Sequence, residues 1–125
     1  MTIPEIAVIE DSESTYRSLR ALLASQYEVK WIQLENEDVK LSSESHPNLY
    51  VLDLGLPDCE IGFRILEHLR KKSPTTPIII LTGYCDARTA VRAMKLGAND
   101  YIQKPLDPDT FLTTINEMIM TPNRH

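Results

Sequence analysis

Three short apolar segments constrain the fold more than any other feature of this sequence. They are Glu5–Ile9, Leu49–Leu54 and Pro77–Leu81. Each is rich in Ile, Val and Leu and alternates little with polar residues, which is typical of strands covered by helices on both faces. Two more mixed segments, Tyr27–Trp31 and Asp100–Lys104, have the polarity expected at sheet edges. The pattern predicts a parallel sheet with these two segments at its edges.

Helical patterns separate the strand segments. Apolar side chains share one helical face in the following sets: Tyr16, Leu19, Leu22 and Leu23; Ile61, Ile65, Leu66 and Leu69; Ala87, Ala90, Val91 and Met94; Phe111, Leu112, Ile115, Met118 and Ile119. Gly97 is placed to end the third of these helices, and Asp107 with Pro108 to begin the last. Another helix is expected near Glu35–Ser45, where the apolar pattern is weak.

Alternating strands and helices imply right-handed crossovers. With the mixed second and fifth strands at the edges, the expected strand order is 2-1-3-4-5. This is an α/β (βα)5 flavodoxin-like fold, a five-stranded parallel sheet with helices on both faces. We expect residues 1–125 to form a single domain, since 125 residues can bury an adequate core.

Composition narrows the function classes. A net charge of −5 argues against a nucleic-acid or anionic-membrane surface, because both favour clustered Lys and Arg. Cys59 and Cys85 are too few and too unpatterned for a disulfide framework or a zinc site. No signal peptide and no apolar stretch of membrane-spanning length is visible. We therefore expect a cytoplasmic protein with reduced cysteines.

Reactive side chains stand at the carboxyl ends of the predicted strands, where ligands bind in sheets of this order. They are Glu10 and Asp11 after the first strand, Asp53 on the third, Thr82 at the end of the fourth and Lys104 at the end of the fifth; Gly83 follows Thr82, and Pro105 follows Lys104. Two carboxylates ~4 Å apart repel by about 4 kcal/mol near a protein surface, so such a cluster needs a cation, or one carboxyl group must hold a proton. Carboxylate oxygens suit magnesium. Together with a lysine and a hydroxyl, they favour phosphoryl transfer onto a carboxylate.

These segments resemble the receiver domain of bacterial two-component response regulators, the CheY-like family. The resemblance covers nearly the whole chain and is carried by Val8–Asp11, Leu52–Asp58, Ile80–Gly83 and Ala90–Pro105. It implies that Asp53 accepts a phosphoryl group from the phosphohistidine of a sensor kinase or a histidine phosphotransfer protein. The domain would catalyse only its own phosphorylation and dephosphorylation.

The resemblance also implies the roles of the neighbouring residues. Asp11, Asp53 and the backbone carbonyl of Gly55 would ligate Mg²⁺, or Mn²⁺ in its place, with Glu10 assisting directly or through water. Lys104 would pair with the phosphoryl oxygens.

The same resemblance assigns a conformational switch. Thr82, with Gly83 beside it, would bind the phosphoryl group, and Tyr101 would turn inward in response. A cis peptide bond would join Lys104 to Pro105. The output surface would comprise the fourth helix, fifth strand and fifth helix of the family, and would bind a downstream effector or a second copy. We expect no contact of this domain with nucleic acid or membrane, and no output domain within this chain.

The sequence departs from the family pattern at Glu10, where Asp is more usual, and at Gly62, which falls one residue late. Alternatives are a magnesium-dependent phosphohydrolase of the haloacid dehalogenase type, a docking module that is not phosphorylated, and a flavodoxin-like electron carrier. The hydrolase usually has a second Asp two residues after its nucleophile, where this chain has Gly55. The intact acidic cluster argues against the docking module, and the first strand lacks the phosphate-binding loop of the electron carrier.

Overall fold

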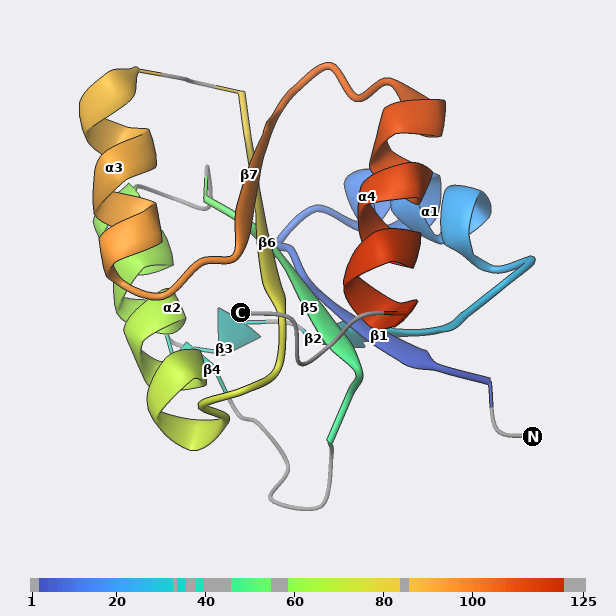
Figure 1. Ribbon diagram of the computed structural model, residues 1–125, viewed down its shortest axis with the longest axis horizontal. Coiled ribbons are helices and arrows are strands. Elements are labelled where there is room, and N and C mark those ends of the chain that lie inside the picture. The colour runs from blue at the N-terminus through green and yellow to red at the C-terminus, as the bar shows by residue number, and fades with distance from the viewer. Residues whose placement is uncertain are drawn as a thin grey trace.

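The computed structural model describes residues 3–32, 34–35, 38–39, 46–54, 59–83 and 86–120. A parallel sheet with the strand order β2-β1-β5-β6-β7 forms its centre (Figure 1). The strands span Glu5–Ile9 (β1), Glu28–Ile32 (β2), Leu49–Asp53 (β5), Ile78–Thr82 (β6) and Asp100–Gln103 (β7). Counted among the parallel strands alone, this is the expected order 2-1-3-4-5, and the flavodoxin-like fold is confirmed.

Helices cover both faces of this sheet. They span Glu13–Leu23 (α1), Cys59–Lys72 (α2), Ala87–Lys95 (α3) and Pro108–Met120 (α4). Figure 1 shows α2 and α3 on one side of the sheet and α1 and α4 on the other. No described helix has the length and apolar character needed to cross a membrane.

Alternate residues of the strands face the two helical layers. In β1, Ala7 and Ile9 belong to the buried cluster that includes α2, whereas Ile6 and Val8 belong to the cluster that includes α1 and α4. Every residue of β5 and β6 is buried, which explains why these strands show continuous apolar runs. The reactive residues can therefore emerge only where these strands end.

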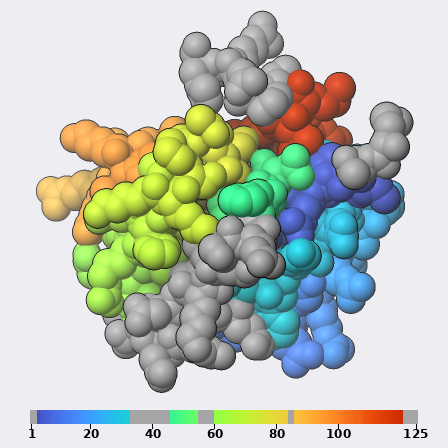
Figure 2. Space-filling model, turned by 90° about the horizontal axis from the view of Figure 1, so that it is seen from below, coloured from blue at the N-terminus to red at the C-terminus, as the bar shows by residue number. Residues whose placement is uncertain are grey.

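Hydrogen bonds also link the strands at the opposite end of the sheet. Figure 2 views the molecule from there, with the green start of β5 between the blue start of β1 and the yellow segment ahead of β6. Asn48, just ahead of β5, links β5 to β1. Its backbone N–H donates to the Glu5 carbonyl at 2.8 Å, and its side-chain oxygen accepts from the Glu5 N–H at 2.9 Å. Pro77 links the segment ahead of β6 to β5, because its backbone carbonyl accepts from the Tyr50 N–H at 2.9 Å. These bonds fix the strand register on which the site depends.

Caps set the helix boundaries as the sequence indicated. The Asp107 carboxylate accepts from the backbone N–H of Thr110 at 3.0 Å, and Pro108 is the first residue of α4. At the end of α3, Gly97 has φ of +112°, a conformation that side chains with a Cβ rarely adopt.

Two expectations about helices were wrong. The helix near Glu35–Ser45 is not formed in the described part of that segment, where Leu34–Glu35 (β3) pairs antiparallel with Asp38–Val39 (β4); the other residues of this segment lie outside the described ranges. The predicted buried face of α3 is also wrong, because Val91 and Met94 are 51% and 47% exposed. Ala93 is buried instead.

Candidate functional site

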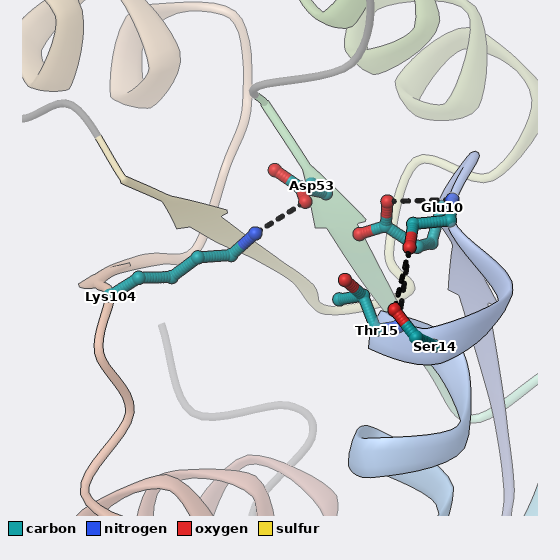
Figure 3. A network of polar contacts seen from close by, with 6 residues as sticks. Glu10, Ser14, Thr15, Asp53 and Lys104 are labelled. Atoms are coloured by element: carbon teal, nitrogen blue, oxygen red, sulfur yellow. Dashed lines mark hydrogen bonds and ion pairs between the residues drawn. The ribbon is translucent and has the colours of Figure 1, made fainter.

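Two carboxyl groups meet where β1 and β5 end. Ile9 pairs with Leu52 in these neighbouring parallel strands, so the next residues, Glu10 and Asp53, occupy adjacent positions. Both side chains are buried, with the two residues only 2% and 6% exposed. Figure 3 shows the Glu10 carboxyl group directed toward Asp53. The predicted convergence of carboxylates from the first and third parallel strands is therefore present for this pair.

Lys104 reaches the same point from β7. Its Nζ lies 2.5 Å from Oδ2 of Asp53, and its extended side chain is visible in Figure 3. The main chain is fixed by the Lys104 N–H, which donates to the Thr82 carbonyl at 2.7 Å. The peptide bond to Pro105 is cis, the isomer that was expected. A short charge-assisted bond of this kind offsets the cost of burying the Asp53 charge.

Among the described residues, none forms such an ion pair with Glu10. Oε1 accepts from the backbone N–H of Ser12 at 3.1 Å, whereas Oε2 is buried and has no hydrogen-bond partner among the described residues. Burial, followed by the nearby carboxyl groups of Asp53 and Asp11, raises the pKa of Glu10 to about 8. A carboxyl group in this position either keeps its proton near neutral pH or requires a positive charge nearby.

These residues fit a magnesium ion held by few protein ligands. Within the described ranges, no three acidic, His or Cys side chains are grouped closely enough to form a metal site by themselves. Asp11 is exposed at the mouth of the site, and Gly55 lies outside the described residues. Magnesium commonly uses only one or two carboxylates and completes its shell with water and phosphate oxygens. The buried Oε2 of Glu10, which has no hydrogen-bond partner in the described part of the chain and lies close to Asp53, meets that requirement.

The remaining predicted residues lie at the same end of the sheet or near it. Thr82 is the last residue of β6 and is 2% exposed, and Gly83 follows it on the surface. Tyr101 lies on β7 opposite Ile80 and is partly buried against the core that includes α2. The structure thus brings Glu10, Asp53 and Lys104 together, and it places Thr82 on the neighbouring strand end.

Sequence reasoning missed two residues that shape the site. Ser12 caps α1, since its hydroxyl accepts from the Thr15 N–H at 3.4 Å, and it also binds the Glu10 side chain. A Ser directly before a helical pattern was the available signal. Trp31 donates from its indole Nε1 to the Glu10 carbonyl at 2.8 Å. No sequence pattern indicates that contact, because it spans two strands.

Comparison with known proteins agrees with this geometry. The family model described as "Response regulator receiver domain" matches residues 6–116. The chain therefore belongs to the response regulator receiver domain family, whose members act in two-component systems as phosphoacceptors.

Individual relatives share moderate identity with this chain. Regulatory protein AtoC of Escherichia coli is 31% identical over 108 residues, which are 86% of this chain and 23% of that protein. A CheY-like receiver domain from Methanospirillum hungatei is 26% identical with a TM-score of 0.83, and the match covers 97% of both chains. A Burkholderia pseudomallei response regulator, solved with a phosphorylated aspartic acid, a calcium ion and citrate, is 29% identical with a TM-score of 0.78, covering 94% of this chain and 69% of that one.

The chain spans only part of several relatives, about a quarter of AtoC and about half of the cell cycle response regulator CtrA of Brucella ovis.

Proposed function

We propose that this domain accepts a phosphoryl group on Asp53 from a phosphohistidine of a partner protein, with a divalent cation bound beside it. The observation that carries this proposal is the buried Asp53 carboxylate with the Lys104 ammonium 2.5 Å away and the raised-pKa carboxyl group of Glu10 next to it. The family membership supports the same chemistry, as does the phosphorylated aspartic acid in the Burkholderia pseudomallei relative.

The reaction is a transfer between two nucleophiles. An Asp53 carboxylate oxygen forms a bond to phosphorus while the phosphorus–nitrogen bond of the donor breaks, and the electron pair of that bond returns to the imidazole, which takes a proton. The product is an acyl phosphate on Asp53. Burial withdraws solvent from this carboxylate, and β5 fixes its position at the strand end.

The surrounding residues balance charge during the transfer. Mg²⁺, or Mn²⁺ in its place, would neutralise phosphoryl oxygens when bound. Glu10, Asp11, Asp53 and the Gly55 carbonyl would hold it. Lys104 exchanges part of its bond with Asp53 for a bond to a phosphoryl oxygen, and the Thr82 hydroxyl, beside Gly83, hydrogen-bonds another.

Phosphorylation would change the surface formed by α3, β7 and α4, with Tyr101 turning inward as Thr82 engages the phosphoryl group. Moving the protein from a mostly inactive to a mostly active population requires that phosphorylation stabilise the active conformation over the inactive one by about 5.5 kcal/mol. A few charge-assisted hydrogen bonds of roughly 1.5–3 kcal/mol each supply that amount. The sparse burial of α3, with Ala93 as its only fully buried described residue, supports its role as the movable element.

The partners follow from this chemistry. A sensor histidine kinase or a histidine phosphotransfer protein would supply the phosphoryl group, and an effector or a second copy would bind the α3–β7–α4 surface. Residues 1–125 act as one receiver unit in this proposal, and the unit modifies only itself.

Incubation with Mg²⁺ and acetyl phosphate tests this proposal without a kinase. The wild type should gain one phosphoryl group by intact mass, and Asp53→Asn should gain none. Equal labelling of both proteins would remove Asp53 from the proposal. Continuous release of phosphate from a phosphomonoester, abolished in Asp53→Asn, would instead support the phosphohydrolase alternative.

A further inference from the structure

Trp31 is the single tryptophan of the chain, and it lies on the edge strand β2 opposite Val8 of β1. Its indole N–H donates to the backbone carbonyl of Glu10 at 2.8 Å. The last paired residues of these two strands are Ile9 and Ile32, so Glu10 lies one residue beyond the ladder. The indole therefore supplies a hydrogen bond to the main chain at the point where β1 turns into the site.

The indole ring is itself held in place by α1. The rings of Trp31 and Tyr16 are stacked, with their centroids 4.8 Å apart and their planes 10° from parallel. Aromatic stacking of this kind adds about 0.5–1.5 kcal/mol beyond simple burial. The stacking on Tyr16 and the hydrogen bond to the Glu10 carbonyl together set the direction of the indole N–H.

Two further hydrogen bonds connect Tyr16 back to Glu10, so that Trp31, Tyr16, Ser12 and Glu10 form a closed set of contacts around the turn. The Tyr16 backbone N–H donates to the Ser12 carbonyl at 3.0 Å, and the Ser12 N–H donates to Oε1 of Glu10 at 3.1 Å. Glu10 is consequently fixed twice, through its main chain by Trp31 and through its side chain by Ser12. The buried Oε2, which has no described hydrogen-bond partner, is available to bind a ligand.

We infer that Trp31 is a positioning residue of the phosphorylation site, which orients Glu10 toward the divalent cation by holding its backbone carbonyl. This inference rests on the proposed function. Because one hydrogen bond is removed while the carboxyl groups remain, loss of the indole N–H should weaken Mg²⁺ binding by about three- to tenfold. The phosphoryl-transfer step at saturating Mg²⁺ should be nearly unchanged, since the indole acts through Glu10, whereas Lys104 pairs with Asp53 directly.

The test compares wild type with Trp31→Phe, which retains an aromatic ring for stacking on Tyr16 but has no N–H. Mg²⁺ affinity is measured by amide NMR shifts without any phosphodonor, and the rate of labelling by acetyl phosphate is then measured against Mg²⁺ concentration. We expect a higher Mg²⁺ dissociation constant with a similar rate at saturation. A second replacement, benzothienylalanine at position 31, removes only the N–H and covers the case in which the Phe variant does not fold.

Val29→Ala is the matched structural control. Val29 lies on the same strand and packs against the core that includes α1, so this change should lower stability and leave Mg²⁺ affinity unaltered. Unchanged Mg²⁺ affinity in both position-31 replacements would overturn the positioning role, as would equal weakening in Val29→Ala. A wild type that neither binds Mg²⁺ nor becomes labelled would instead overturn the proposed function on which this role depends.

Discussion

At the scale of single residues, the site contains two buried carboxyl groups and one described cation that pairs with only one of them. Asp53 and Glu10 are both buried, but only Asp53 has a described cation within bonding distance, namely Lys104 at 2.5 Å. The fold therefore stabilises one carboxylate and leaves the other with its pKa raised to about 8. Such an arrangement favours uptake of one additional positive charge.

The raised pKa of Glu10 predicts a specific pH dependence of stability in metal-free solution. The folded protein holds a proton that the unfolded chain releases between the ordinary value of 4.5 and about 8, so stability should fall as pH rises through that window. Each unit of pKa difference corresponds to about 1.4 kcal/mol, and we expect a fall of at least about 1 kcal/mol. Urea unfolding across this range measures it.

Glu10→Gln is the matched variant, because it keeps the shape and removes the titrating group. The other ionisable groups are common to both proteins, so their contributions cancel in the comparison. The free energy of unfolding of Glu10→Gln should decline less with pH than that of wild type. Parallel declines in the two proteins would show that Glu10 does not titrate as the structure indicates.

At the scale of elements, end groups and loops determine which side chains reach the site. The α2 and α3 helices are linked by Arg92, which pairs with Glu60 at 2.6 Å and lies over the Phe63 ring at 4.1 Å. The pair is exposed and contributes little energy. The connection from α3 to β7 is tighter, because Arg70 donates to the Gly97 carbonyl at 2.6 Å and to the Asn99 side chain at 2.7 Å.

Gly97→Ala should destabilise the protein by about 1–3 kcal/mol, because φ of +112° is unfavourable for a residue with a Cβ. The added Cβ would also lie 2.9 Å from the Arg70 side chain. Urea unfolding measures the loss. Gly83→Ala is the control: apart from its chain neighbours, no atom of the described residues lies within 4 Å of the added Cβ, so the stability of this variant should change by less than about 0.5 kcal/mol. Equal stability of the two variants would contradict this account of the turn.

Sequence alone predicted the elements that have a continuous apolar run or a clear apolar helical face, and it missed the segment that has neither. Leu49–Leu54 was recognisable because every position of β5 is buried. The antiparallel pair of β3 and β4 was not recognisable, because its segment has no clear apolar period. A helix was expected there from the alternation of elements. The orientation of α3 was missed because apolar residues lie on more than one of its faces. The face that is buried contains Ala93, whereas Val91 is exposed.

The same distinction applies to the site. Asp53 and Lys104 were predictable because the ends of parallel strands meet at one edge of a sheet, and the structure joins them directly. The contact of Trp31 with Glu10 depends on an indole reaching across strands, which only coordinates reveal. The metal-ligand set, with Gly55 outside the described residues and Asp11 exposed, remains a prediction.

At the scale of the whole molecule, a sheet whose strands β5 and β6 are buried along their whole length carries the reactive residues at its carboxyl end. The strands β5 and β6 are packed on both faces, so their ends are rigid positions for Asp53 and Thr82. The α3 helix, by contrast, presents Val91 and Met94 to solvent. The molecule thus combines a fixed chemical edge with a less buried helix, which suits a domain that converts a covalent modification into a change of surface.

The position of the phosphoryl group is the most direct test of this account. Wild-type protein labelled with acetyl phosphate in Mg²⁺ would be reduced with borohydride, which converts an aspartyl phosphate to homoserine, and then sequenced by peptide mass spectrometry. We expect homoserine at position 53 and at no other position. Homoserine elsewhere, or a phosphoryl group retained on His46 or on a hydroxyl side chain, would contradict it.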